Sequence, residues 1–534
     1  AQEPVRHRPG AAAGDRLSHI RLSTVGVAPH DYGSRAFSSV GRLVVVALVS
    51  VLTAFPLSIT MIGRASPTTC ASFFRISASN IWRDIDTMTD KKQGTRTGSA
   101  ESGMLCNSGV GGSETLDFDV VVAGGGSAGS AAAIAAARRG HRVLLVEELN
   151  CLGGISTGGG VHEWFASQHG VGNVFAWLRG ELERGGALMN GRHFNGEFLK
   201  YHWQHLAEKA GVVLLFNASI IGAQSIDGRI VSIAIACCGR RLEATARFFI
   251  DASGEGDLGF LAGCQFMKGQ PESGRVLHMS LTALLVRSAG PVTPYLPEGL
   301  EPINSKDDFP GLGVFIPLED GRVYCNMTKV MGLDPTSPLE LTAAECEARR
   351  QLIRMVHYLQ RTSFQGYILA ASGSRIGIRE GRRIVGEYVL GERDILGPVH
   401  FDCHDGVCVG TSQIDFHSLT HSGSGGWREK VKPYSIPFRS LVAKDMKNML
   451  MAGKCISVDQ VVHSSCRMTP TCCAMGQAAG TAAALALETG IADIRELAMA
   501  GLRAQLTADG MELDPSRHAA FAPDAEAESR NRHL

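Results

Sequence analysis

The sequence has no excess of charge of either sign, and no basic block occurs in the body of the chain. Its 534 residues contain 52 Lys and Arg against 52 Asp and Glu. Proteins that bind nucleic acid usually gather positive charge on one face, where it meets the phosphates. The balanced composition therefore argues against a nucleic-acid partner. The chain also lacks an internal repeat.

The sequence also lacks cysteines at metal-binding spacing. Fourteen cysteines are present, but no C-x-x-C pair occurs among them, and the adjacent pairs Cys237-Cys238 and Cys472-Cys473 have no partner clusters. Zinc sites need such clusters. We therefore expect no metal site, and we interpret the cysteines as buried free thiols.

Residues 1–116 lack the periodicity of a folded domain, with one apolar run as the exception. Leu43 to Ile62 is just long enough to span a bilayer. It contains Pro56, and the arginines upstream of it suit a targeting segment equally well. Three interpretations stay open: a membrane anchor, a targeting segment, or an extension without a role in the fold. The protein would be anchored, exported or organelle-targeted in the first two cases, and otherwise cytoplasmic.

A glycine-rich turn between two apolar runs carries the clearest signal. Val120 to Ala123 predicts a short buried strand, Gly129 to Arg139 an Ala-rich helix, and Val143 to Val146 a second strand. Gly124, Gly126 and Gly129 between them have the G-x-G-x-x-G spacing. In that pattern the glycines make a tight turn, admit a pyrophosphate and let the helix pack closely on the strand.

Two further residue groups fit a dinucleotide at this turn. The phosphates would lie at the helix N-terminus, and Ser127 and Ala128, just before the expected helix, would contact the cofactor there. Glu147 ends the second strand, where a carboxylate accepts hydrogen bonds from a ribose. The fingerprint alone does not choose between FAD and NAD. No second unit of this kind follows, which argues against a tightly bound NAD(P)H as internal reductant.

Four separated stretches together resemble a known family. They begin at "DVVVAGGGSAGSAAAIAAARRGHRVLLVEELNCLGG" and continue with "FFIDASGEGDLGFLAG", "IGIREGRRIVGEYVLGERDIL" and "YSIPFRSLVAKDMKNMLMAGKCISVDQVVHSSCRMTPTCCAMGQAAGTAAALA". In this order they resemble the FAD-dependent oxidoreductases of the glutathione-reductase-like superfamily, and within it the bacterial-type "FAD dependent oxidoreductase" proteins. The sequence departs from the family at Gln460, where a histidine is common, and at Gly381, where Ser or Thr is usual.

The resemblance implies an α/β fold and a domain plan. A discontinuous, Rossmann-like FAD-binding domain would carry an inserted α+β substrate or cap domain. The expected divisions are an extension over 1–116, the FAD-binding domain over 117–269 and 441–490, the cap domain over 270–440, and a C-terminal helix and polar tail over 491–534.

The resemblance also implies FAD as the cofactor, and it extends the set of residues expected to contact it. Gly153 and Gly154 would pass close to the flavin ring, and Asp251 and Gly254 would end a strand of the domain. The segment around Gly453 would return to the pyrophosphate. A helix opening near Thr471, with Gly476, Ala479 and Gly480, would point its positive end at the flavin.

Three residues are the candidates for catalysis. Arg379 follows an apolar segment and would bind or polarise the substrate, although such charged runs often form structural ion pairs. His463 and Arg467 precede the flavin-facing helix, and a histidine there could take the proton that remains after hydride removal. His417 and His162 are weaker candidates. Cys151 and Cys466 could form a redox pair or a covalent flavin anchor, but we favour inert thiols.

The leading functional hypothesis is a flavoenzyme that transfers a hydride between a small organic substrate and noncovalently bound FAD. One alternative is a membrane-tethered dehydrogenase that passes electrons to quinone, which depends on Leu43 to Ile62 being an anchor. A flavin-dependent tRNA-modifying protein and a non-catalytic flavin-binding protein are further alternatives, and the charge balance speaks against the former. The direction of the reaction, the substrate and the electron acceptor are not encoded in these patterns.

Overall fold

The computed structural model describes residues 114–521 with gaps at 312, 319 and 422–425. The expected segment Leu43 to Ile62 lies outside these residues. Within the described part of the chain, no helix combines the length and apolar character that crossing a membrane requires.

A five-stranded parallel sheet forms the centre of the fold. Its strand order is β21-β10-β2-β3-β6. The strands are β2 (Val120–Ala123), β3 (Val143–Val146), β6 (Val213–Leu215), β10 (Phe248–Asp251) and β21 (Met449–Met451). Strands β2, β3, β10 and β21 are completely buried, as expected for the apolar runs of a parallel sheet covered on both faces. The sequence thus predicted β2 and β3 correctly.

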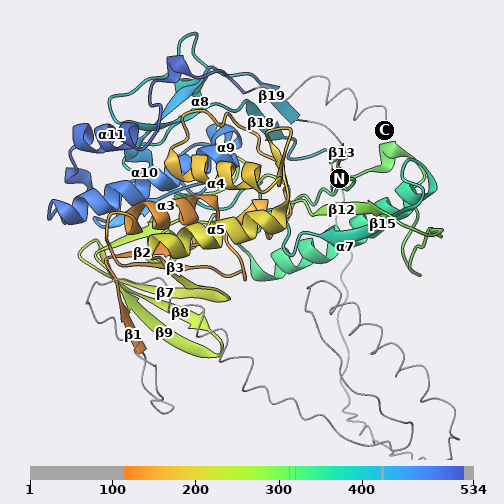
Figure 1. Cartoon of the computed structure of the whole chain (residues 1–534), viewed down its shortest axis with the longest axis horizontal. Coiled ribbons are helices and arrows are strands. Elements are labelled where there is room, and N and C mark those ends of the chain that lie inside the picture. Colours follow the sequence, from red (N-terminus) through yellow and green to blue (C-terminus); the bar gives the residue numbers. More distant parts are fainter. Residues whose placement is uncertain (1–113, 312, 319, 422–425, 522–534) are drawn as a thin grey trace, which may run out of the picture. The chain divides into compact units, whose positions relative to one another are not determined.

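Two helices on one side of this sheet pack closely, because glycines of one lie against alanines of the other (Figure 1). They are α3 (Ser127–Ala137) and α10 (Thr469–Glu488). A Cβ atom on Gly476 would lie 1.9 Å from the backbone oxygen of Ala128, and one on Gly480 would lie 2.1 Å from that of Ala132. The two glycines lie one turn apart on one face of α10. The C-terminal segment is therefore joined to the first βαβ unit through backbone contact.

A second sheet, with the order β1-β9-β8-β7, lies across the parallel sheet from these helices (Figure 1). It contains β1 (Glu114–Asp117), β7 (Ala218–Ile226), β8 (Arg229–Cys237) and β9 (Arg240–Thr245). The hairpin between β7 and β8 turns at Asp227 and Gly228, both with positive φ, which is the conformation that an Asp-Gly pair favours in a two-residue hairpin turn. Strand β1 pairs in parallel with β9, so the expected boundary between residues 116 and 117 falls inside a strand.

The expected cap region contains its own antiparallel sheet, ordered β13-β14-β12-β15, and the long helix α7 (Figure 1). The strands are β12 (Thr282–Arg287), β13 (Val314–Pro317), β14 (Val323–Asn326) and β15 (Tyr367–Ser372), and α7 covers Pro338–Arg361. Ser337 precedes the helix but makes no side-chain cap bond, and Glu340 instead accepts from the N–H of Asp334.

The remaining elements are short strand pairs and connecting helices. The paired strands are β4 (Leu188–Met189) with β5 (His193–Phe194), β11 (Phe266–Met267) with β16 (Arg383–Ile384), β17 (Gly406–Gly410) with β20 (Tyr434–Pro437), and β18 (Ile414–His417) with β19 (Gly426–Glu429). The remaining helices are α4 (Asn173–Arg184), α5 (Gly196–Ala210), α6 (Asp257–Leu261), α8 (Glu392–Ile395), α9 (Gln460–Cys466) and α11 (Met499–Ala508). The architecture is α/β, with one central parallel sheet and additional antiparallel sheets. The residue numbers of the domain division stay a prediction.

Candidate cofactor and substrate site

A large cavity opens at the carboxyl ends of strands β2, β3, β10 and β21. It contains about 1250 Å³ of empty space, part of it open to solvent. Segments far apart in sequence line it, including Gly124 to Ala128, Ser253 to Glu255 and Ala452 to Lys454. In α/β folds the carboxyl edge of the sheet is where ligands bind. The fold thus places the glycine-rich turn and the C-terminal segment on the walls of one cavity.

The glycine turn leaves open space at the N-terminus of α3. A Cβ atom on Gly126 would meet no atom within 4 Å, and the residue has φ −62°. Gly124, in contrast, has φ +90°, and a Cβ there would lie 2.6 Å from the backbone oxygen of Ala252. Gly124 is therefore required by the turn itself, whereas Gly126 is the position where a ligand can approach the backbone.

Glu147 borders the cavity at the end of β3 and is 5% exposed. Its carboxylate accepts hydrogen bonds from the N–H groups of Gly125 and Leu149. Burial raises the pKa of Glu147, and these two hydrogen bonds oppose that rise. The bonds hold the carboxylate at the glycine turn, which suits an acceptor for a ribose.

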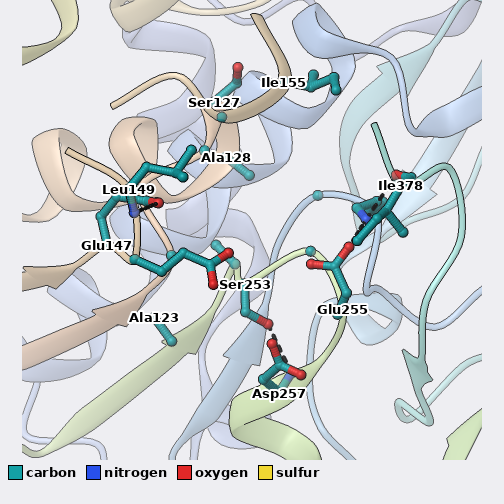
Figure 2. A pocket seen from close by; sticks show the side chains of 18 of the residues that line it. Ala123, Ser127, Ala128, Glu147, Leu149, Ile155, Ser253, Glu255, Asp257 and Ile378 are labelled. Carbon is teal, nitrogen blue, oxygen red and sulfur yellow. Dashed lines mark hydrogen bonds and ion pairs between the residues drawn. The ribbon is translucent and has the colours of Figure 1, made fainter. Parts of the chain in front are cut away.

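An ion pair lies across the cavity from Glu147 (Figure 2). Lys454 Nζ pairs with the Glu255 carboxylate and donates to the backbone oxygen of Ile378 at 3.1 Å. Burial raises the pKa of Glu255, and the charge of Lys454 opposes the rise. Lys454 thus connects three segments of the wall: the turn after β10, the loop before β16 and the turn after β21. The sequence patterns had not singled out Glu255.

About half of the residues predicted to bind the cofactor line this cavity. They are Gly124, Gly126, Ser127, Ala128, Glu147, Gly154, Gly254 and Gly453. Gly129, Gly153, Asp251, Gly476, Ala479 and Gly480 are not among its lining residues. Their positions point to structural roles, which differ from residue to residue.

Gly476 and Gly480 permit the contact between α10 and α3, and Ala479 is completely buried on the same helix. A Cβ on Gly129 would lie 1.8 Å from the backbone oxygen of Gly124, which is the close helix-to-turn packing expected of the third fingerprint glycine. Asp251 is buried and accepts from Ser253 and from the N–H of Gly259. These residues shape the cavity from behind its walls.

A charged group adjoins the cavity, and we call it the arginine–histidine cluster: Arg379, Arg467, His278, His417 and Asp415. Arg467, at the C-terminus of α9, also lines the cavity. Asp415 Oδ2 accepts from Arg467 at 3.2 Å and from His417 Nε2 at 3.0 Å. The rings of His278 and His417 meet at right angles with centroids 4.6 Å apart. Arg379 donates to Ser280 Oγ at 2.7 Å and to the backbone oxygen of His278 at 3.3 Å.

Burial and nearby charges shift the pKa values of the residues in this cluster. Burial, followed by the nearby charge of Arg467, lowers the pKa of Arg379 to about 10, so the guanidinium stays charged at neutral pH. Burial alone would raise the pKa of Asp415, but the bond from His417 and the charge of Arg467 hold it well below its usual value. Burial lowers the pKa of His417 to about 4 despite Asp415. The histidines are therefore neutral at neutral pH.

His463 does not reach the cavity. Its side chain is completely buried inside α9 and is not among the lining residues. Burial, then the charges of Arg383 and Arg467, hold the pKa of His463 well below its ordinary value. His417, ranked lower from the sequence, is the histidine that the fold brings to Arg379 and Arg467.

The charged run after Arg379 serves structure. Glu380 is completely buried and pairs with Arg383, while Arg382 pairs with Asp257 at 2.9 Å. Gln460 donates to Glu380 at 2.6 Å. The run thus divides between Arg379 at the cavity side and an internal ion-pair network.

The two cysteines weighed as reactive are buried free thiols. Burial raises the pKa of Cys151, and it raises that of Cys466 well above the usual range. No group of three or more His, Cys, Asp or Glu side chains suited to a metal occurs within residues 114–521 as described.

Comparison with known proteins identifies the class. The model of the family "FAD dependent oxidoreductase" matches residues 119–506. The chain therefore belongs to the FAD-dependent oxidoreductase family, and FAD is its cofactor. It is a flavoprotein enzyme with a Rossmann-type dinucleotide-binding domain, and an enzyme of this kind requires a substrate and a redox partner. No curated protein matches the chain.

Solved structures with similar folds come from several flavin enzymes. A geranylgeranyl bacteriochlorophyll reductase-like protein from Thermoplasma acidophilum matches with 13% identity and a TM-score of 0.39, covering 78% of this chain and 96% of its own. The myxobacterial chondrochloren halogenase, an FAD-dependent halogenase, matches with 15% identity and a TM-score of 0.39, covering 78% and 89%. Anhydrotetracycline hydroxylase from Streptomyces rimosus matches with 12% identity and a TM-score of 0.37, covering 78% and 73%.

The residues of the cavity fit FAD. The open position at Gly126 and the N-terminus of α3 suit the pyrophosphate, and the fixed Glu147 carboxylate suits the adenosine ribose. The N-terminus of α10 is also at the cavity, where Thr469 and Cys472 line the wall. One end of the cavity thus suits the dinucleotide, and Arg467 connects the other side to the arginine–histidine cluster.

Proposed function

We propose that the protein transfers a hydride between a small organic substrate and noncovalently bound FAD, with the substrate held by the arginine–histidine cluster. The observation that carries this proposal is Arg467, which lines the cofactor cavity and also bonds Asp415 in the cluster. A group bound at the cluster would therefore lie beside the cofactor. Bound FAD supplies the two-electron acceptor or donor that the side chains of the chain lack.

Arg379 and Arg467 would orient the substrate, and His417 would exchange the proton. When a C–OH or C–NH bond is oxidised, the hydride leaves with two electrons and the O–H or N–H proton needs a base. The bond from His417 Nε2 to Asp415 places a proton on Nε2 and leaves Nδ1 as the accepting nitrogen. Asp415 would stabilise the resulting cation, as a carboxylate does for a catalytic histidine. In the opposite direction the same imidazole would return the proton.

The test of hydride transfer is anaerobic reduction of the purified flavoprotein with a panel of hydroxy acids, sugars and amines, followed by flavin absorbance. We expect at least one compound to bleach the flavin. With that compound, His417→Gln should slow the reduction on the order of a hundredfold or more while FAD occupancy stays unchanged. His463→Gln should change the rate much less. Equal losses in both variants would contradict the assignment of His417.

A pair of glycine variants tests the cofactor position. Gly126→Val should fold, because the added side chain enters open space, but it should lose FAD because that space receives the pyrophosphate. Gly476→Val should instead fail in folding, since its Cβ alone would lie 1.9 Å from the oxygen of Ala128. Flavin absorbance and circular dichroism separate the two outcomes. A Gly126→Val protein that keeps its flavin would place the pyrophosphate elsewhere.

A further inference from the structure

The arginine–histidine cluster contains more positive than negative charge, and it holds buried nitrogen atoms without a hydrogen-bond partner among the described residues. Arg467 shares the single Asp415 carboxylate with His417, and Arg379 has no ion-pair partner among the residues that the structure describes. Arg379 makes its hydrogen bonds to a serine hydroxyl and a backbone oxygen only. Arg428 Nε also pairs with Asp415, at 3.3 Å, so the guanidinium groups around Asp415 outnumber its single carboxylate.

Two buried nitrogen atoms of the cluster have no hydrogen-bond partner within the described chain. They are Nε of Arg467 and Nδ1 of His278, whose residue is 6% exposed. A buried polar atom without a hydrogen-bond partner costs free energy, and it costs more when the group is charged. The His278 ring touches His417, and Arg379 bonds the backbone of His278. The two nitrogen atoms without a partner and the unpaired charge of Arg379 therefore lie in the same cluster.

We propose that the arginine–histidine cluster binds a carboxylate group of the substrate, so that the substrate is a small organic anion. A carboxylate has four acceptor positions and one negative charge, which matches two guanidinium groups and a neighbouring imidazole. Arg379 and Arg467 are the binding residues, and His278 is the third contact. This assignment rests on the proposed function, because it places the anion beside the cofactor that Arg467 borders.

The composition of the cluster favours a carboxylate over a neutral polar group. A sugar or an amide would leave the charge of Arg379 without a counter-charge in a partly buried setting, which is unfavourable. The carboxylate would also stabilise a protonated His417 by adding negative charge nearby. Binding of the anion would in this way prepare the imidazole to hold the substrate proton.

The experiment compares matched anions and amides as ligands of the oxidised, FAD-loaded protein. The probes are oxalate with oxamide, and lactate with lactamide, measured by the flavin difference spectrum and by the shift in Tm at constant ionic strength. We expect each carboxylate to bind at least about tenfold more tightly than its amide, because only the carboxylate gives the arginines a hydrogen-bonded counter-charge. Equal binding of acids and amides, or no response to any acid, overturns the inference.

Variants of the two arginines give a second measurement. Arg379→Gln and Arg467→Gln should each weaken oxalate binding about tenfold or more, and Arg379→Lys should retain part of it. Arg349→Gln, at an exposed arginine paired with Glu345 on α7, is the matched control and should bind as the wild type does. If the arginine variants fail to fold, the comparison of acids with amides on the wild-type protein still tests whether the cluster binds a carboxylate.

Failure of this inference and failure of the proposed function give different results. If a neutral sugar or amine reduces the flavin and no carboxylate binds, hydride transfer is supported and the anionic substrate is contradicted. A protein that binds oxalate at Arg379 but is reduced by no compound keeps the anion site and contradicts the proposed reaction. A protein without flavin contradicts the assignment of the cavity.

Discussion

At the scale of single residues, the cavity wall consists of groups whose roles follow from local sequence and groups brought together by the fold. Gly124, Gly126 and Glu147 lie within one βαβ unit, so their spacing was sufficient to place them. Glu255, Lys454 and Arg467 come from separate segments, and their meeting depends on strands β10 and β21 lying side by side. Local patterns contain no information on which distant segments become neighbours.

His162 gives a prediction of pH dependence at this scale. It is 7% exposed, and burial followed by the charge of Arg322 lowers its pKa to about 4. An unfolded histidine titrates at about 6.5. The unfolded state therefore takes up the proton first, so stability is complete above about pH 6.5 and is lost as the pH falls toward about 4.

The measurement is the free energy of unfolding in urea at about pH 7 and about pH 5. We expect His162→Gln to lose less stability over that interval than the wild type, by up to about 1.4 kcal/mol for each pH unit. His404→Gln, at an exposed histidine, is the control. The same pH dependence in wild type and His162→Gln would contradict the buried neutral histidine.

The histidines show what local sequence could not place at the residue scale. His463 was favoured because it precedes the flavin-facing helix, yet it lies on the inner face of α9 and is completely buried. His417 was ranked lower because a structural role was the simpler interpretation of its sequence. It is Asp415, two residues earlier on β18, that places His417 beside Arg467.

At the scale of elements, long periodic segments were predictable and their ends were less so. Helix α5 and the hairpin of β7 and β8 follow directly from their patterns. Helix α10 begins two residues before the expected Thr471. Strand β1 was missed because its short stretch, Glu114 to Asp117, has weak alternation and gains its bonds only from β9.

A buried ion pair joins three elements of the expected cap and cofactor regions. Glu380, in the loop before β16, pairs with Arg383 at the start of that strand. It also accepts hydrogen bonds from the N–H groups of Gly269 and Leu277 and from the side chain of Gln460 on α9. Glu380→Gln would leave the guanidinium of Arg383 buried and unpaired. We expect a loss of about 3–5 kcal/mol in the free energy of unfolding.

Urea unfolding of the FAD-loaded protein measures this loss. Arg350→Gln removes an exposed pair with Glu347 on α7 and should change stability by no more than about 0.5 kcal/mol. An equally small effect for Glu380→Gln would show that water reaches Arg383 and that the network contributes little.

At the scale of the whole molecule, β1 is the first element of the part of the chain that the structure describes. Deleting residues 1–113 should leave a yellow protein with unchanged Tm, because the strand partner of β9 is kept. Deleting residues 1–118 should lower Tm by several degrees, since it removes β1 and the ion pair of Arg142 with Asp117. Flavin absorbance and thermal unfolding measure both. Loss of flavin in the shorter deletion would extend the required chain toward the N-terminus.

The contact of α10 with α3 has a consequence for the order in which the protein is made. The glycine turn and α3 leave the ribosome long before Gly476 and Gly480, so the nascent chain carries half of a cofactor cavity for most of its synthesis. Pairings this distant in sequence form slowly, and the uncovered alanine face of α3 would be open to chaperones in the interval. Appearance of bound flavin would then report that translation has passed α10, and ribosome-bound chains that stop before Thr469 should stay colourless.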